Sequence, residues 1–362
     1  MATTAFGTNH ALAVKLWSEK LFHEALKECW LGKFIGVDSN SIIQRQTETE
    51  KSAGDQITVG LRMQLTGAGV QGDNTLEGNE EALTLYSDAV KIDQLRHAVR
   101  SAGQMSEQRI PFEVRQEAKN GLRDWFATRI DLWGFNQLCG YTPQTDTRYT
   151  GNQAVVAPDS NHQLWSSISG TITADESLTS TDIFTLGLID RAVVRAKTLD
   201  VATAAGLVPI RPVMIGGEEK YVLFIHPYQH YQLRATSGSQ YYDIQKAALQ
   251  GGQISKNPIY TGAIAEYNGC IIHESIRCMP GVNSSTGAAV AAARRAVLCG
   301  AQAALMAFGQ GNGPNRMSWV EELFDFKNQL AVSAGFIAGL KKTRFNSLDF
   351  GSLVLSSYSA AP

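Results

Sequence analysis

Three glycines, Gly67, Gly69 and Gly72, fit the G-x-G-x-x-G pattern that holds the pyrophosphate in dinucleotide-binding folds. That chemistry requires a helix that starts at the glycines, so that its backbone amides face the phosphates. Here Asp73 and Glu77 follow, no apolar helical face accompanies them, and their charge would repel a phosphate. The sequence therefore favours a flexible loop, and a nucleotide-binding enzyme that uses these glycines is kept as an alternative of a different class.

Two histidines, His226 and His230, stand four residues apart, a spacing at which one helix face can hold a metal ion. The H-E-x-x-H pattern needs a glutamate after the first histidine, and Pro227 occupies that position. No third ligand is evident, so we expect both rings to pack or to cap. No G-x-S-x-G or G-x-x-x-x-G-K-[ST] motif occurs. We expect no catalytic residue, no cofactor and no metal, and hence a protein that is not an enzyme.

The composition is that of a globular chain with few charges. Its 362 residues include 32 basic and 34 acidic side chains, a net charge of −2, and charged residues make up 18%. That fraction lies below the usual quarter, and a near-neutral chain is not basic enough for free nucleic-acid recognition by counterion release. A poorly charged surface is instead a hint that part of it contacts protein.

The five cysteines, odd in number and without C-x-x-C spacing, argue against a disulfide framework or a zinc ribbon. We expect all five to be reduced and mostly core-filling, in a soluble chain made in a reducing cytoplasm. The first ten residues lack a signal-peptide pattern, and no apolar run is long enough to span a membrane. We therefore expect no membrane contact.

Two alternating segments predict an extended β-hairpin. Residues 54–65 alternate apolar and polar side chains, and residues 83–92 alternate again. The glycine-rich acidic loop between them is far longer than an ordinary hairpin connection. Because an isolated two-stranded hairpin is marginal in water, we expect it to lean on another surface, and nothing nearby in the sequence offers one.

Residues 111–138 predict the strongest helix. Pro111 suits the first turn, Gly140 suits the position after the C-cap, and an apolar stripe spaced by three and four runs between them. About 28 residues at 1.5 Å each span roughly 42 Å, longer than most globular domains need. Gly121 in the middle either weakens the helix or marks close packing or a bend. The stripe contains Leu122, Trp125, Phe126 and Trp133.

The rest of the chain predicts a mixture of helices and strands without an internal repeat. We expect an amphipathic helix over 10–34, either a surface helix or an arm on a neighbouring subunit, and a polar extended connector over 141–180. Ser180 or Thr181 is the expected cap of a helix over 182–199. Short helices are expected at 227–233 and 242–249. The expected strands are 221–225, 259–265, 270–274, 296–298, 319–326, 329–335 and 336–343.

The order of these parts resembles the Hong Kong 97-like major capsid fold of tailed phages, an α+β fold. More closely, the sequence resembles the major capsid proteins of the podophage family that includes the Enquatrovirus-type heads. The matches are short but keep their order over about residues 54–345. The matching stretches are Gly54–Val59, Leu65–Gly67, Gly72–Asp73, Leu76–Glu81, Met105–Arg109, His226–Gln229, Cys299–Ala303 and Gly339–Lys342.

The resemblance implies five parts of the chain. Residues 1–53 would be an N-terminal arm, and 54–105 the extended loop with its flank. Residues 106–165 would be the peripheral domain, with the long helix as its spine, and 166–300 the axial domain. Residues 301–362 would be strands returning to the peripheral domain and a C-terminal tail. The spine residues are Pro111, Leu122, Trp125, Phe126 and Trp133.

The function implied is that of a virion shell protein that forms hexamers and pentamers around packaged double-stranded DNA, contacted nonspecifically. Assembly would occur in the host bacterial cytoplasm, and a portal and a cement or decoration protein are further partners the resemblance leaves open. The extended loop would lie over the neighbouring subunit. The residues assigned to that contact are Ile57, Val59, Leu61, Met63, Leu65, Gly67, Gly69, Gly72, Asp73, Leu76, Glu77, Glu80 and Glu81. A nanocompartment shell of the encapsulin type, which packages an enzyme on the same fold, is the second hypothesis.

Overall fold

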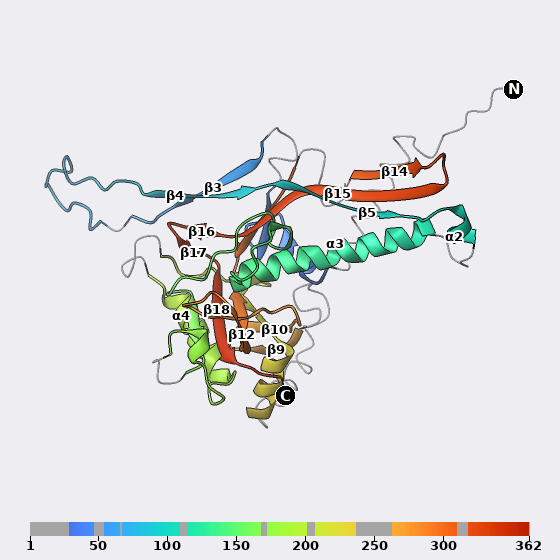
Figure 1. Cartoon of the computed structure of the whole chain (residues 1–362). Helices are drawn as coiled ribbons and strands as arrows, with labels where there is room; N and C mark the ends of the chain where they lie inside the picture. The colour runs from blue at the N-terminus through green and yellow to red at the C-terminus, as the bar shows by residue number, and fades with distance from the viewer. Residues whose placement is uncertain are drawn as a thin grey trace.

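The computed structural model consists of an elongated upper layer and a lower body beneath its middle (Figure 1). It describes residues 29–46, 54–65, 67–108, 114–167, 172–200, 207–236, 263–309 and 318–361. No helix in these ranges is long and apolar enough to cross a membrane.

The lower body is built on an eight-stranded sheet with the order β6-β18-β12-β8-β10-β9, to which β11 and β7 add at β12 and β8. Helix α4 (Leu186–Thr198) and the helical residues 227–236 pack on this body. The strands are β6 (Gln163–Trp165), β7 (Val213–Ile215), β8 (Glu218–Ile225), β9 (Ala263–Tyr267), β10 (Cys270–Glu274), β11 (Pro280–Val282), β12 (Ala289–Cys299) and β18 (Ser352–Tyr358).

The upper layer is organised by one long strand, β15 (Gln329–Lys342). Its first part pairs with β14 (Ser318–Phe324) on one side and β5 (Asp93–Arg100) on the other, and its end pairs with β13 (Ala304–Phe308). Strands β2 (Ile43–Gln46) and β1 (Ile35–Gly36) continue the sheet beyond β13. We call β5, β14 and the paired part of β15 the wing.

Helix α3 (Val114–Cys139) lies along the wing and reaches the lower body with its C-terminal end (Figure 1). Leu122 and Phe126 of this helix belong to the same core cluster as Trp319, Val332 and Phe336 of the wing. That cluster continues into one face of the lower sheet through residues such as Phe224 and Val297, whereas a second cluster joins the other face to α4. One continuous core therefore connects the two layers.

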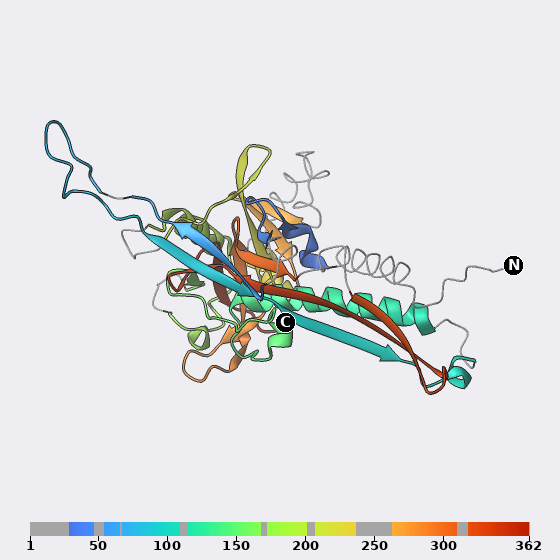
Figure 2. The same cartoon turned by 90° about the horizontal axis from the view of Figure 1, so that it is seen from above.

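The hairpin consists of β3 (Gln56–Arg62) and β4 (Leu85–Lys91). Strand β4 runs almost directly into β5, so the hairpin and the wing extend in opposite directions from the body when seen from above (Figure 2). The remaining elements are short: η1 (Trp30–Phe34), α2 (Gln104–Gln108), η3 (Thr147–Tyr149), η4 (Asp175–Ser177), β16 (Arg344–Phe345) and β17 (Leu348–Asp349).

Several predicted elements are found, with shifted ends. The long helix is confirmed from Val114 to Cys139, and Gly140 after it has φ +61°, as a C-cap glycine should. The helix after residue 182 starts only at Leu186 with Thr185 at its N-cap, so the predicted caps Ser180 and Thr181 are wrong. Instead, the Asp182 carboxylate accepts a 2.9 Å hydrogen bond from the Thr179 amide in a turn ahead of the helix.

Other expectations need correction. The two strands predicted over 329–343 form one strand, because β15 crosses from the wing to the body without a turn. The supposed connector over 141–180 contains β6, η3 and η4, which polar side chains anchor to the body. Strand β18 lies in the lower sheet, not in the upper layer. The predicted helix over 242–249 and Pro111 lie outside the described residues, as does most of the predicted helix over 10–34.

Candidate interaction surfaces

The outer part of the hairpin carries apolar side chains that are exposed to solvent. Leu65, Leu76, Leu83 and Leu85 are each more than half exposed. Among them lie Asp73, Glu77, Glu80 and Glu81, and no lysine or arginine occurs between Met63 and Val90. This end of the molecule is therefore both apolar and acidic.

The base of the hairpin is fixed to its own chain. Ile57 and Val90 form a small core with Leu305 and Ala307 of β13, and Met63 is also buried. Asp88 of β4 accepts a hydrogen bond from Lys341 Nζ and a 3.0 Å bond from the Arg344 amide. The apolar face predicted for the hairpin thus divides into a base covered by its own subunit and an uncovered outer half.

The glycine loop does not have the geometry of a dinucleotide site. Residues 67–84 contain no helix, and Gly69, Gly72 and Gly78 have φ values of +71°, +67° and +91°. Their left-handed backbone lets the loop turn where other residues would be strained. The Gly67 amide donates a hydrogen bond to the Glu81 carboxylate at 2.7 Å. A phosphate at this amide would have to displace that negatively charged carboxylate. The arrangement contradicts a Rossmann-type phosphate cradle at these glycines.

A second exposed apolar group lies at the opposite end, on the turn between β14 and β15. Phe326 is fully exposed, and Met105, Leu323 and Phe324 beside it are at least one third exposed. We call residues 323–328 together with Met105 the wing tip. Sequence reasoning missed it, because Phe326 was assigned to the end of a strand predicted over 319–326, whereas β14 ends at Phe324.

The predicted spine residues divide between core and surface. Leu122, Phe126 and Trp133 are buried, and the Trp133 indole donates to the Arg148 carbonyl at 2.8 Å. Trp125 is half-buried and stacks on His97 of β5 with ring centroids 4.6 Å apart. These contacts make α3 the support of the wing.

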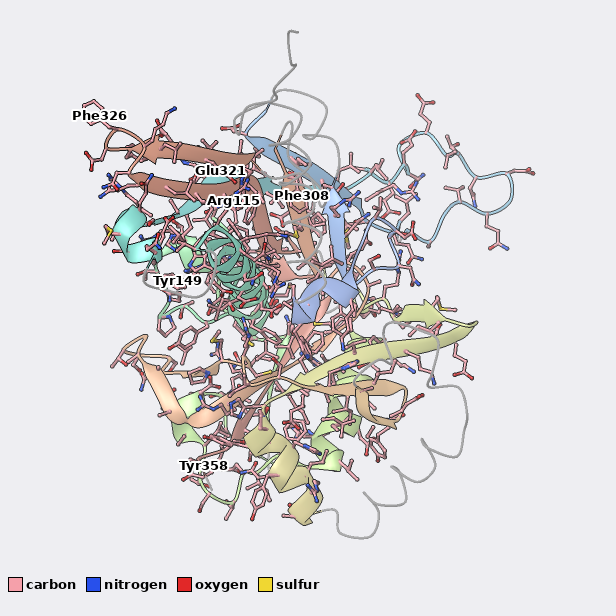
Figure 3. The ribbon with its side chains drawn as sticks, turned by 90° about the vertical axis from the view of Figure 1, so that its right-hand side faces the viewer. Arg115, Tyr149, Phe308, Glu321, Phe326 and Tyr358 are labelled. Atoms are coloured by element: carbon pink, nitrogen blue, oxygen red, sulfur yellow. The ribbon has the colours of Figure 1, made fainter. Side chains whose placement is uncertain are left out.

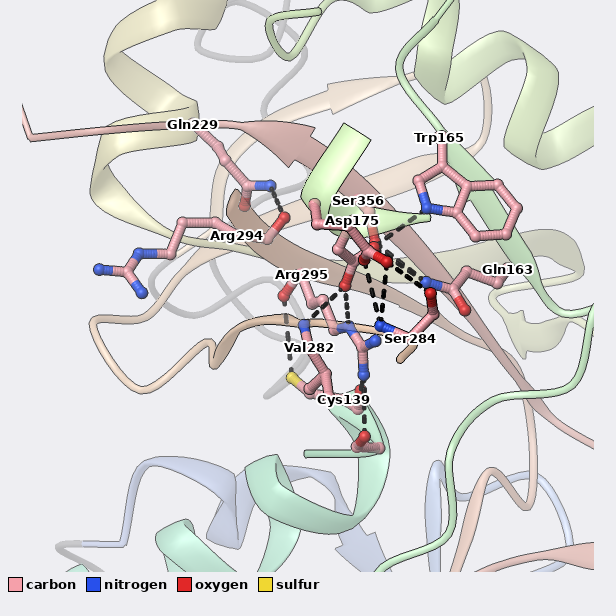
Figure 4. A network of polar contacts seen from close by, with 12 residues as sticks. Cys139, Gln163, Trp165, Asp175, Gln229, Val282, Ser284, Arg294, Arg295 and Ser356 are labelled. Atoms are coloured by element: carbon pink, nitrogen blue, oxygen red, sulfur yellow. Dashed lines mark hydrogen bonds and ion pairs between the residues drawn. The ribbon is translucent and has the colours of Figure 1, made fainter. Parts of the chain in front are cut away.

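A buried arginine of the lower sheet, Arg295, joins the end of α3 to that sheet (Figure 4). Arg295 of β12 donates from Nε to Asp175 Oδ2 at 2.8 Å, and its Nη1 donates to the carbonyls of Cys139 and Gly140 at 3.1 and 2.8 Å. Arg295 therefore satisfies carbonyls that the C-terminus of a helix leaves open, and its charge suits the negative end of the helix dipole. We call this group the latch.

Asp175 is the hub of the latch. Its Oδ1 accepts from Trp165 Nε1 at 3.0 Å and Gln163 Nε2 at 3.1 Å, and its Oδ2 also accepts from the Val282 amide at 2.9 Å. A buried carboxylate with several donors is satisfied despite the loss of water. Sequence reasoning missed Asp175 and Arg295, because their partners are 120 residues apart along the chain.

The histidines and cysteines considered above as possible metal ligands or reactive groups take part in packing and hydrogen bonding. His226 Nδ1 accepts from the Tyr228 amide at 3.2 Å, so this ring caps a helix as expected, and His230 Nδ1 lies 2.6 Å from Glu274. All five cysteines are free and buried, and burial raises the pKa of Cys139 to about 11. Within the described ranges no group of three or more His, Cys, Asp or Glu side chains could hold a metal ion.

Comparison with known proteins agrees with this arrangement. A family model described as "Phage capsid protein" matches residues 5–361. The chain is 29% identical to the major capsid protein of Pseudomonas phage KPP25 over 374 residues, covering 96% of this chain and 94% of the relative. Among solved structures it is similar to the capsid of Ralstonia phage GP4, with a TM-score of 0.80, 34% identity and coverage of 100% and 99%. The capsid of cyanophage Pam1 shares the fold, with a TM-score of 0.71, 22% identity and full coverage of both chains.

Proposed function

The chain belongs to the phage capsid protein family, and we propose that each copy binds the adjacent subunits of the shell through the outer half of its hairpin. It is the major capsid protein of a tailed phage, a structural protein of the virion that forms the head shell and not an enzyme. This membership decides against the nanocompartment and the nucleotide-binding enzyme. The proposal concerns how the shell is held together.

The finer assignment is a Hong Kong 97-like fold of the podophage, Enquatrovirus-type kind. In it the hairpin is the extended loop, α3 is the spine of a peripheral domain formed with the wing, and the eight-stranded sheet is the axial domain. The position of β18 in that sheet supports moving residues 352–358 from the peripheral to the axial domain. Hexamers and pentamers of such subunits would close around double-stranded DNA in the host cytoplasm. A net charge of −2 fits nonspecific contact with the DNA, and the portal and a cement protein are further partners in this proposal.

The observation that carries the proposal is the set of exposed leucines on the hairpin. Leu76, Leu83 and Leu85 have no partner core within the described part of their own chain, in contrast to Ile57 at the base. Burying apolar surface stabilises by roughly 25 cal/mol per Å², and ordering the loop offsets part of that gain. Many such modest contacts, closed into a shell, make a stable particle.

The experiment compares shell formation with subunit folding. A variant that lacks residues 66–80, and the double variant Leu76→Ser with Leu83→Ser, should give subunits with unchanged circular dichroism and unfolding midpoint. Neither should give shells in negative-stain microscopy or sedimentation. Thr75→Ser in the same loop is the matched control and should assemble as the wild type does. Normal shells from the deletion would refute the proposal.

A further inference from the structure

A pocket of about 370 Å³ lies between η1 and β1 on one side and β7 on the other. Phe34, Ile35 and Val213 are among the apolar residues that line it, and Lys33 lines it as well. Figure 3 shows the segment that contains η1, in blue, between the upper layer and the pale yellow-green strands of the lower body. This volume lies in the range in which proteins hold small organic molecules.

Hydrogen bonds join the two sides of the pocket. The Asn40 side chain donates from Nδ2 to the Met214 carbonyl at 2.8 Å, and its Oδ1 accepts from the Met214 amide at 2.8 Å. The Arg211 guanidinium adds a hydrogen bond to the Ser39 carbonyl. The pocket is therefore preformed, and a ligand does not have to order its walls.

The amine of Lys33 lies at the aromatic wall of this pocket. Its Nζ is 4.9 Å from the centre of the Phe34 ring and 5.0 Å from the centre of the Trp30 ring. The same nitrogen lies 3.4 Å from Nδ1 of His273, whose side chain is fully buried. The two rings and the imidazole together restrict where the amine can lie.

Two opposing effects act on the charge of this amine. The aromatic rings of Trp30 and Phe34 favour the ammonium form, whereas burial disfavours it. Burial is the larger effect, and it lowers the pKa of Lys33 from its ordinary value of 10.5. A lowered pKa leaves more of the amine uncharged at neutral pH, and the uncharged amine is the nucleophile.

We propose that Lys33 is a nucleophile that captures a small aromatic aldehyde held in this pocket. Nζ attacks the carbonyl carbon, and the proton that Nζ gives up is taken by the carbonyl oxygen. Loss of water from this carbinolamine then leaves an imine between Nζ and the former carbonyl carbon. In the tautomer that carries its proton on Nε2, His273 can accept the proton from Nζ at Nδ1 and pass it to the oxygen.

The lining of the pocket selects the class of aldehyde. Phe34 and Val213 offer apolar contact to a ring, which favours an aromatic compound. The Asp38 carboxylate also lines the pocket and would repel an anion, so the ring should be uncharged. This site is independent of the contacts between subunits, so its failure would leave the proposed function untouched.

Reductive labelling of the full chain with benzaldehyde and cyanoborohydride tests the reaction. The hydride traps the imine as a stable secondary amine, and peptide mass spectrometry then gives the labelling rate at each lysine. Lys33 should be labelled at least about fivefold faster than the exposed Lys91, because the pocket holds the carbonyl beside the amine. Labelling of Lys33 at the rate of Lys91, or slower, would overturn the inference.

The dependence on concentration separates a pocket from a lysine that is merely reactive. The rate at Lys33 should saturate as benzaldehyde is raised, and benzyl alcohol, which has the same ring without the carbonyl, should slow it. The rate at Lys91 should rise linearly and be unaffected by the alcohol. A linear rate at Lys33 that the alcohol does not change would overturn the inference.

Two matched substitutions identify the nucleophile. Lys33→Arg keeps a positive charge beside the rings but removes the amine, so the fast labelling should disappear while circular dichroism stays unchanged. Lys91→Arg is the control and should keep the fast labelling. Fast labelling that survives Lys33→Arg would place the nucleophile elsewhere and overturn the inference. The wild-type measurements depend on neither variant.

Discussion

Asp175 and Arg295 form a 2.8 Å ion pair whose side chains are 1% and 5% exposed, at the point where the long helix meets the lower sheet. Arg295 also holds the last carbonyls of α3, so a single guanidinium connects the helix end, η4 and β12. The hairpin, wing and lower body are therefore oriented relative to one another by polar contacts as well as by the shared core.

Removing one partner of the latch should destabilise the subunit strongly. Asp175→Ala leaves the Arg295 guanidinium buried without its counter-ion, and breaking a buried pair in this way costs about 3–5 kcal/mol. Urea unfolding of unassembled subunits measures the loss. Asp124→Ala is the control, because its ion pair with Arg123 lies at the surface, and it should leave the unfolding midpoint nearly unchanged. Equal effects of the two substitutions would contradict the account of the latch.

The stability of the subunit should depend on pH through His226. Burial, with a smaller contribution from Arg294, lowers the pKa of His226 to about 4 from 6.5. Between pH 4 and 6.5, His226 binds a proton in the unfolded chain but stays neutral in the folded chain. Its contribution to stability is therefore complete above pH 6.5 and is lost as the pH falls towards 4. The shift corresponds to roughly 3 kcal/mol.

The variant His226→Asn isolates this effect. Asparagine can accept the same capping hydrogen bond from Tyr228 but does not titrate. The difference in unfolding free energy between wild type and variant should therefore be constant above pH 7 and change by about 3 kcal/mol in favour of the variant by pH 4. A difference independent of pH would show that the ring is not buried in its neutral form.

Two glycine substitutions should act in opposite directions. A Cβ at Gly339 of β15 would lie 1.9 Å from the Lys91 carbonyl oxygen, at the junction of hairpin and wing. Gly339→Ala should therefore cost about 1–3 kcal/mol or more through overpacking. Gly121 of α3 has no atom within 4 Å of such a Cβ, so Gly121→Ala should stabilise by about 0.8–1 kcal/mol. Thermal unfolding measures both, and a stabilising Gly339→Ala would mean that the hairpin base is not packed as described.

The predictable features were those that repeat along the chain. The alternation of apolar and polar residues predicted β3 and β4, and the helical spacing of apolar residues predicted α3, because each of these elements has one apolar face. The continuity of β15 was not predictable, since a strand that changes partners halfway carries no local signal for its length. The start of α4 was placed too early, because Asp182 closes a turn of its own instead of the first turn of the helix.

The interaction surfaces were only partly predictable. The apolar alternation from Ile57 to Leu65 was evident, but not its division between own chain and solvent, which depends on the distant residues Leu305 and Ala307. Phe326 is exposed in a turn whose Lys327 carbonyl accepts a hydrogen bond from Gln104, more than 200 residues earlier. Asp175 stood in a polar segment without periodicity, and only the fold shows why it is buried. Long-range pairing decided each of these cases.

A reconstruction of the assembled shell by electron cryo-microscopy tests the central claim most directly. We expect the hairpin between Leu65 and Leu85 to lie on an adjacent subunit, with Leu76 and Leu83 covered by that subunit. A shell in which this segment folds back onto its own lower body, or projects uncovered into solvent, would contradict the account.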